Sequence, residues 1–275
     1  MSRSSITILG DLAARARRVG AGSVLRRAVR VVDRVYAALG RAPLTVEVAG
    51  AEIHGYLRHR SFLAETTRPA RTYVDLFLRT VRPGMTIVDG GAHVGLYTVL
   101  GARAVGPDGL VLAFEPDRYN LAALRLNVHG ATNVRIVEKA LTDAPGTATF
   151  HETPSTIGSS LLERADSSTR VVETTSVDAE LGERRAPSLL VKLNVEGAEP
   201  LVIAGMRETL DRVRSISMLV EVNPALVSAA GTDVDALVRT LEGEGFAVGF
   251  VDLETQDVVH LPAPIPKGHI FASRG

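Results

Sequence analysis

Apolar and polar positions along this chain follow two patterns, which alternate from one segment to the next. Short continuous apolar runs predict strands that are covered on both faces, as in a parallel sheet. Between these runs, apolar residues recur at helical spacing and predict amphipathic helices. Alternating strands and helices predict a doubly wound α/β sheet in one compact domain, residues 61–275. The expected strands are residues 86–88, 110–114, 134–137, 147–151, 171–175, 189–193, 216–222, 246–251 and 269–272.

The helices between these strands carry start and stop signals in the sequence. Asp or Thr at a first position, Pro just inside it, and Gly or Pro after the end are typical of helix boundaries. The expected helices are residues 68–82, one that begins at Gly95, one capped by Asp117, one that runs from Pro200 to Leu210, and one that a capping box of Thr232 and Asp235 begins.

Residues 1–60 form an accessory region with a pattern of its own. A hairpin is expected around Gly50, with arms at residues 45–48 and 51–57. Before it, a helix is expected, and its arginines lie largely off the apolar stripe. This helix has three open interpretations: a cap packed on the domain or on a second subunit of a homodimer, a helix on a membrane surface, or disorder near the terminus. The stripe consists of Leu25, Val29, Val32, Val35, Tyr36 and Leu39.

Composition narrows the function classes without choosing one. The chain has 275 residues, of which 45% are hydrophobic and 23% charged, and its formal net charge is zero. These values are typical of a soluble globular protein and give no global preference for nucleic acid or membranes. Cysteine is absent, which excludes disulfides, thiolate metal sites and a cysteine nucleophile. Neither a signal peptide nor a transmembrane segment is recognisable, so we expect a cytoplasmic protein.

The candidate chemistry centres on the glycine-rich turn at residues 89–95, which follows the expected strand 86–88. A dinucleotide fingerprint needs a third-position glycine, and Ala92 stands there. Asp89, at the end of the strand, would repel a pyrophosphate. The same carboxylate would attract the ammonium and sulfonium groups of S-adenosylmethionine, and glycines let the backbone approach such a ligand closely. The turn therefore favours S-adenosylmethionine as cofactor.

Glu115, at the end of the next strand, supports the same cofactor. An acid in this position can accept hydrogen bonds from both ribose hydroxyls of a nucleoside. The candidate cofactor-binding residues are Asp89, Gly91, His93, Gly95, Glu115, Pro116, Asn120, Ala140 and Asn194.

A third polar segment ends the strand at residues 189–193. Lys192 lies in this apolar run, where a lysine is costly to bury without a partner. We expect Glu196, Glu199 or Glu221 to pair with it.

Methyl transfer from a sulfonium to a hydroxyl is an in-line displacement that depends on positioning and is assisted by a base. The candidate catalytic residues are Glu196, Glu221, Lys192 and His151.

Taken together, these segments resemble the FkbM-type methyltransferases. The resemblance runs from about residue 60 to residue 223, and it implies a class I Rossmann-like domain with a seven-stranded core and a reversed last strand. It also implies S-adenosylmethionine as cofactor and O-methylation of a hydroxyl on a sugar, polyketide, other natural product or surface glycan. The matching segments are residues 87–98, Ala113-Phe114-Glu115-Pro116, Val177-Asp178, residues 192–199 with Lys192 and Glu196, and Glu221.

Two positions depart from the family pattern. His93 stands where the family usually has an asparagine, and Asn194 stands where it usually has an aspartate. An asparagine can neither act as a base nor hold a divalent cation strongly, and the histidines show no metal-ligand spacing. We therefore expect no essential metal and a base elsewhere in the site.

The partners and the alternatives follow from the same residues. We expect a small-molecule or glycan acceptor, bound between the N-terminal region, the loop at 151–165 and the loop after Glu221. Nucleic acid is not expected, because the chain has only five tyrosines and no tryptophan. Two other functions stay open: an NAD-type oxidoreductase or epimerase, and a family member that binds the cofactor without catalysis.

Overall fold

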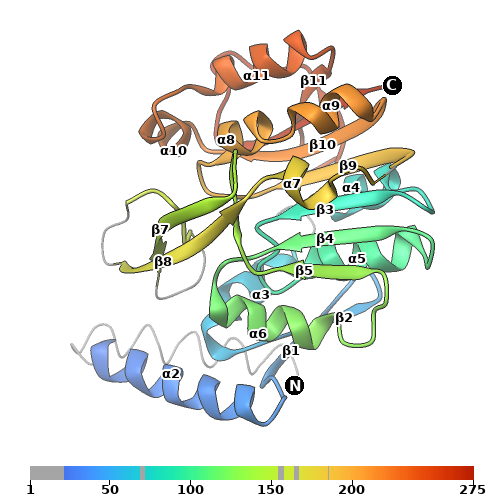
Figure 1. Cartoon of the computed structure of the whole chain (residues 1–275). Coiled ribbons are helices and arrows are strands. Elements are labelled where there is room, and N and C mark those ends of the chain that lie inside the picture. Colours follow the sequence, from blue (N-terminus) through green and yellow to red (C-terminus); the bar gives the residue numbers. More distant parts are fainter. Residues whose placement is uncertain (1–21, 69–71, 154–157, 164–166, 185) are drawn as a thin grey trace.

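An eight-stranded sheet forms the centre of the molecule (Figure 1). This computed structural model describes residues 22–68, 72–153, 158–163, 167–184 and 186–275, without the side chains of residues 22–27. The strand order is β12-β11-β13-β10-β9-β3-β4-β5. The strands are β3 (Thr86–Gly90), β4 (Leu110–Phe114), β5 (Val134–Val137), β9 (Ser188–Leu193), β10 (Ser215–Val222), β11 (Ala247–Val251), β12 (Val258–Val259) and β13 (Gly268–Arg274).

The direction of the strands confirms the predicted fold class. Strands β5, β4, β3, β9 and β10 are mutually parallel. The last strand, β13, lies between β10 and β11 and runs antiparallel to both. This arrangement is the doubly wound core with a reversed last strand, and β12 adds a two-residue edge to it.

Helices cover both faces of this sheet. Successive residues of β3 belong to different cores: Ile87 packs with α4 and α5, whereas Val88 packs with the helices after β9. Apolar side chains on both sides of a strand are what a doubly covered parallel sheet requires. The helices of the domain are α4 (Val74–Thr80), α5 (Leu96–Val105), α6 (Arg118–Asn127), α7 (Val177–Leu181), α8 (Glu199–Ala204), α9 (Arg207–Arg212), α10 (Pro224–Ala229) and α11 (Val234–Gly243).

A small second sheet lies beside the carboxyl ends of β3 and β4 (Figure 1). It has the order β6-β8-β7 and contains β6 (Ala140–Leu141), β7 (Gly146–Glu152) and β8 (Ser168–Thr175). The sequence predicts parts of β7 and β8 but not β6. The two long strands form an antiparallel hairpin whose connecting residues approach the main sheet, since the Ser160 hydroxyl donates to the Glu196 carbonyl.

The accessory region is joined to the domain by polar contacts. The predicted hairpin exists as β1 (Leu44–Val48) and β2 (Ala51–Gly55). The Asn127 amide on α6 holds it, because its oxygen accepts from the His54 N–H at 2.8 Å and its nitrogen donates to the His54 carbonyl at 2.8 Å. A 3₁₀ turn, η1 (Leu57–His59), and helix α3 (Arg60–Thr66) follow, so the expected boundary at residue 60 falls where α3 begins.

Three expected helices differ from the prediction for local reasons. The helix expected over residues 68–82 covers only Val74–Thr80, and Val81 is already extended. The helix expected from Pro200 to Leu210 breaks at Gly205, where a Cβ atom would lie 2.5 Å from the Thr142 carbonyl oxygen. The cap of α11 is Asp233 rather than Thr232, because its carboxylate accepts from the Ala236 N–H at 2.6 Å.

The N-terminal helix is confirmed as α2 (Gly22–Ala38), but its apolar stripe does not pack on the domain. Val32, Val35 and Leu39 are exposed, while Asp33 is buried and accepts hydrogen bonds from the backbone of η1. The side chain of Leu25, the first residue of the predicted stripe, lies outside the described residues. Across the part of the chain that the structure describes, no helix is long and apolar enough to cross a membrane.

The buried side chain of Gln256 should determine how firmly α4 is held. Its oxygen accepts from the Asp75 and Leu76 N–H groups, and its nitrogen donates to the Thr72 carbonyl. We expect Gln256→Ala to lower the free energy of unfolding in urea by about 2 kcal/mol, because it leaves two N–H groups at the start of α4 without this acceptor, and that of Leu76 is buried. The exposed neighbour Glu254 provides the control, and Glu254→Ala should change stability little; equal effects of the two changes would contradict the role of Gln256.

Candidate active site

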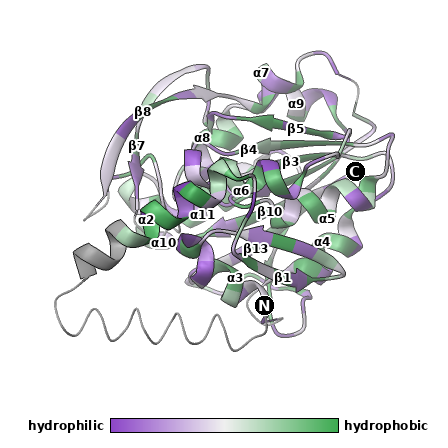
Figure 2. Ribbon diagram, turned by 90° about the horizontal axis from the view of Figure 1, so that it is seen from below, coloured by the Kyte–Doolittle hydropathy of each residue, from purple (hydrophilic) through white to green (hydrophobic). Residues whose placement is uncertain are grey.

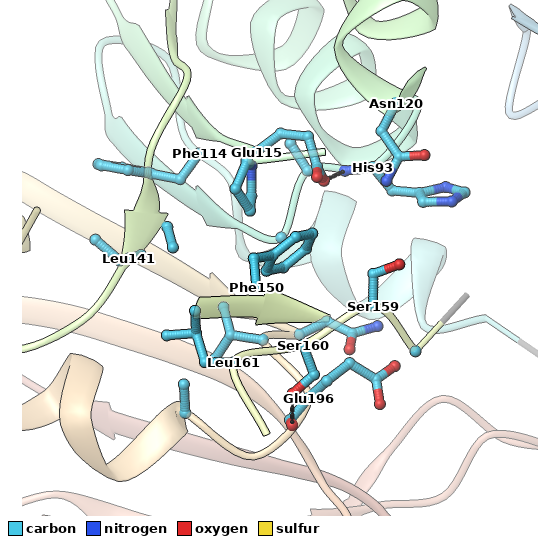
Figure 3. A pocket seen from close by; sticks show the side chains of 18 of the residues that line it. His93, Phe114, Glu115, Asn120, Leu141, Phe150, Ser159, Ser160, Leu161 and Glu196 are labelled. Carbon is cyan, nitrogen blue, oxygen red and sulfur yellow. Dashed lines mark hydrogen bonds between the residues drawn. The ribbon is translucent and has the colours of Figure 1, made fainter. Parts of the chain in front are cut away.

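A pocket lies at the carboxyl ends of β3, β4 and β9 (Figure 3). Its walls come from the turn after β3, from Glu115 and Pro116 after β4, and from residues 194–196 after β9. Phe150 on β7 and residues 158–161 close the side that faces the small sheet. Open α/β sheets bind ligands at this edge, where the order of strands reverses between β3 and its two neighbours.

The glycine-rich turn packs against the end of β9 at the closest distance that a backbone allows. Gly91 has φ +73°, and a Cβ atom there would lie 1.9 Å from the Asn194 carbonyl oxygen. The Asn194 N–H donates to the Gly90 carbonyl at 3.0 Å and continues the ladder between the two strands. Only glycine fits at position 91, so the turn and the end of β9 form one rigid floor.

His93 adopts the left-handed conformation, with φ +55°. Asparagine, aspartate and histidine are the side chains most tolerant of this region, so the histidine keeps the backbone that an asparagine would have. Its ring packs 4.3 Å from the Phe62 ring and 5.3 Å from the His59 ring, measured between centroids. Burial holds the pKa of His93 well below its usual value, so the imidazole is neutral at pH 7.

Glu115 is a buried carboxylate at the pocket wall. One of its oxygens accepts from the His93 N–H at 2.7 Å, and the other accepts from the Asp117 N–H at 2.8 Å. Burial, with the nearby charge of Asp117, raises its pKa to about 7. Within the described residues no cation lies at ion-pair distance from it. The Asn120 side chain is a third uncharged donor to this carboxylate. The site thus suits uncharged donors such as hydroxyl groups, and it fits the ribose of S-adenosylmethionine.

Asp89 and Lys192 form a buried ion pair behind the turn. The Lys192 ammonium lies 3.0 Å from an Asp89 oxygen and donates to the carbonyls of Gly90 and Gly91. The other Asp89 oxygen accepts from the Thr98 hydroxyl at 2.6 Å. Lys192 is therefore paired with Asp89, and the expected partners Glu196, Glu199 and Glu221 were wrong. β3 and β9 are neighbours in which Asp89 and Lys192 are register partners, so both side chains lie on the same face.

Carboxylates gather at the ends of β9 and β10. Glu196 lines the pocket in a left-handed conformation, with φ +54°. The Asn194 amide hydrogen-bonds Glu221, and His269 approaches the same carboxylate at 3.9 Å. Burial, with the charge of Glu196, raises the pKa of Glu221. Glu199 is buried and accepts from the N–H groups of residues 195 and 197, so it serves the local turn.

The structure brings most of the candidate residues to one pocket. His151 is not part of its lining; its ring bonds to the Ser167 hydroxyl at 3.2 Å. Asp89, Gly95 and Glu221 also lie outside the lining, each directly behind residues that belong to it. The candidates that line the pocket are Gly91, His93, Glu115, Pro116, Asn120, Ala140, Lys192, Asn194 and Glu196.

The sequence missed the apolar part of the lining. Such residues have the same periodicity as core residues, so only their place next to the polar loop at 151–165 could have drawn attention to two of them, Phe150 and Leu161. The apolar residues that were missed are Phe62, Ala92, Leu96, Tyr97, Phe114, Leu141, Phe150, Leu161, Val195 and Ala198. In the same part of the chain that the structure covers, no group of three or more His, Cys, Asp or Glu side chains is arranged to hold a metal ion.

The ion pair should stabilise the fold far more than a surface lysine does. We expect Lys192→Met to lower the free energy of unfolding by about 3–5 kcal/mol, because Asp89 would remain buried without a counter-charge. The double variant Asp89→Asn/Lys192→Met should recover a large part of that loss. Lys139, which lies near the exposed Glu173 and the half-buried Glu180 and is itself partly exposed, is the control, and Lys139→Met should cost less than about 1 kcal/mol. Urea unfolding measures all three; similar losses for the two single variants would contradict the buried pair.

One family model matches more than half of this chain, and several solved structures are similar to it in fold. Residues 89–248 match the Methyltransferase FkbM domain. No curated protein sequence matched the chain. An rRNA methylase from Streptococcus thermophilus is similar in structure at 13% identity and TM-score 0.41, with 75% of this chain and 96% of that chain covered. Fibrillarin from Aeropyrum pernix, with natively bound S-adenosyl-L-methionine, is similar at 13% identity and TM-score 0.45, with 84% and 81% covered.

The family match decides the class of enzyme. It begins at Asp89 and ends within β11, and so includes the glycine-rich turn, Glu115 and the segment around Lys192. It leaves the dinucleotide alternative without support, because the matched family is a family of methyltransferases. The chain belongs to the FkbM methyltransferase family.

Proposed function

We propose that this methyltransferase transfers the methyl group of S-adenosylmethionine to a hydroxyl of a sugar, a polyketide or other natural product, or a surface glycan. The observation that carries the proposal is the placement of Glu196 on the pocket wall opposite Glu115 (Figure 3). One carboxylate can hold the ribose, and the other lies across the cavity, where an acceptor hydroxyl would need a base. Few aromatic side chains are available to stack bases, which favours a small-molecule or glycan acceptor over nucleic acid.

The pocket offers each part of the cofactor a matching surface. Glu115 would accept hydrogen bonds from the two ribose hydroxyls. Phe114, Leu141 and Phe150 provide apolar walls that suit a flat adenine ring. The amino-acid end would lie toward Asn194 and the backbone of the turn. When bound, the cofactor supplies an electrophilic methyl group on its sulfonium.

Glu196 is our candidate for the base. It would accept the proton of the acceptor hydroxyl while the new bond between oxygen and carbon forms. Lys192 does not suit this role, because its ammonium is held by Asp89 and by two carbonyls of the turn. Glu221 is the second candidate, and it would act next to Asn194, to which it is hydrogen-bonded. His151 lies outside the pocket lining and is the weakest of the four.

A cofactor-binding protein without catalysis is the second candidate function. The specific feature in its favour is Asn194, which provides no carboxylate where the family usually has one. The two functions differ in one measurable way. Both bind S-adenosylhomocysteine, but only the enzyme forms a methylated product from a hydroxyl acceptor.

Cofactor affinity should depend on the ionisation of Glu115. Its raised pKa of about 7 means that the carboxylate is mostly ionised at pH 8 and mostly protonated at pH 6. We expect the Kd of S-adenosylhomocysteine to rise about tenfold when the pH falls from 8 to 6, because only the ionised form accepts from both hydroxyls. Calorimetric titration measures the change. Glu115→Gln should bind weakly with no pH dependence in this range; a wild-type affinity that is the same at both pH values would contradict the role of Glu115.

The base should act on turnover and not on cofactor binding. With the best acceptor from a panel of hydroxylated sugars and polyketides, we expect Glu196→Gln to lower kcat by about 100-fold. The Kd of S-adenosylhomocysteine should change less than about twofold. Glu208, exposed on α9, provides the matched control, and Glu208→Gln should keep the wild-type kcat. If Glu196→Gln keeps the full kcat, Glu196 is not the base, and Glu221 becomes the candidate. If Glu196→Gln loses cofactor affinity as strongly as it loses kcat, Glu196 acts in cofactor binding rather than in catalysis.

A further inference from the structure

Helix α2 presents its apolar face to the outside of the molecule. The side chains of Val31, Val35 and Leu39 are 59%, 54% and 65% exposed, and Val32 and Tyr36 on the same face are 37% and 36% exposed. Figure 1 shows α2 along the lower edge of the molecule, and Figure 2 shows hydrophobic residues among its turns. A contiguous apolar stripe of this kind on a folded surface indicates a contact with another molecule.

The opposite face of α2 fixes this orientation. Asp33 is buried and accepts from the N–H groups of Leu57 and Arg58 at 2.8 and 3.3 Å. Ala37, one turn further on, packs against the core under the hairpin, and Arg34 hydrogen-bonds the Tyr119 hydroxyl. The helix is thus held to the body by its polar side, and it cannot bury the stripe by turning over without breaking these contacts.

The spacing of the stripe is that of a helix–helix seam. Ala28, Val32, Val35 and Leu39 are separated by four, three and four positions, which is the a/d pattern of paired helices. The four positions that flank this seam are also uncharged: Val29, Val31, Tyr36 and Ala38. Arg30 and Arg34 lie outside them on the helix. Two copies of this arginine-rich helix can therefore meet along the seam without placing like charges against each other.

We propose that α2 is a dimerisation helix and that its stripe packs against the stripe of a second copy of this chain. A two-fold axis brings the same surface of both copies together, so one self-complementary stripe is sufficient. A membrane surface fits less well. A helix that binds anionic lipids gains from basic residues at the border of its apolar face, whereas Arg34 is directed to Tyr119 on the body. The proposal is independent of the acceptor and of the chemistry in the pocket.

The oligomeric state of the full chain tests the proposal. We expect sedimentation velocity at about 100 µM to give twice the chain mass of 29.2 kDa. Val35→Glu should weaken the dimer by at least about 100-fold, because it places a charge in the seam. Val171→Glu is the matched control, since Val171 is 68% exposed on β8, away from α2, and this variant should remain a dimer. Circular dichroism and thermal unfolding establish that both variants are folded.

Three results would overturn the proposal. The wild-type chain could sediment as a monomer at all concentrations, or Val35→Glu could dimerise as strongly as Val171→Glu. The third result would be a monomeric wild-type chain that co-sediments with vesicles containing anionic lipid but not with neutral vesicles. That result would assign the stripe to a membrane surface. If Val35→Glu fails to fold, Arg30→Glu and Leu39→Ser repeat the comparison on opposite faces of the same helix, and only Leu39→Ser should weaken the dimer.

Discussion

The buried ion pair between Asp89 and Lys192 is the interaction on which the site depends. It links β3 to β9, the two strands between which the connectivity of the sheet reverses direction. The Lys192 ammonium also donates hydrogen bonds to the carbonyls of Gly90 and Gly91, so the group that neutralises Asp89 holds the turn as well. Because a buried pair costs desolvation energy, such good geometry with additional hydrogen bonds is what makes it tolerable. The same turn needs glycine at position 91, since it lies against the backbone of residue 194.

A second set of contacts makes the accessory region part of the pocket. Phe62 on α3 packs on His93, and the His59 ring is hydrogen-bonded to Asn120 at 3.2 Å. Asn127 connects the hairpin to the carbonyl of Val94 within the same turn. The histidine at position 93 thus has neighbours that suit an aromatic ring, while its backbone keeps the left-handed conformation. The N-terminal region and the glycine-rich turn are consequently one packed unit.

The sequence predicted what local pattern can encode. The order of strands and helices, the reversed last strand and the glycine-rich turn follow from periodicity, turn chemistry and family resemblance. The partner of Lys192 could not be predicted in this way: three glutamates lie nearer in the sequence or in the next strands, whereas Asp89 becomes adjacent only through strand register. The sequence also could not predict that the apolar stripe of α2 faces outward. That orientation depends on hydrogen bonds from the backbone of η1 to Asp33. Apolar pocket walls such as Phe150 are indistinguishable from core until the cavity is formed.

The hydrogen bond between Asn194 and Glu221 limits the negative charge at the ends of β9 and β10. An aspartate at position 194 would place another negative charge beside Glu221, whose pKa burial and Glu196 already raise. A neutral amide instead leaves room for two acids at the ends of β9 and β10. The Asn194 amide therefore lets Glu196 and Glu221 lie near each other without a further carboxylate on residue 194 between the two strand ends.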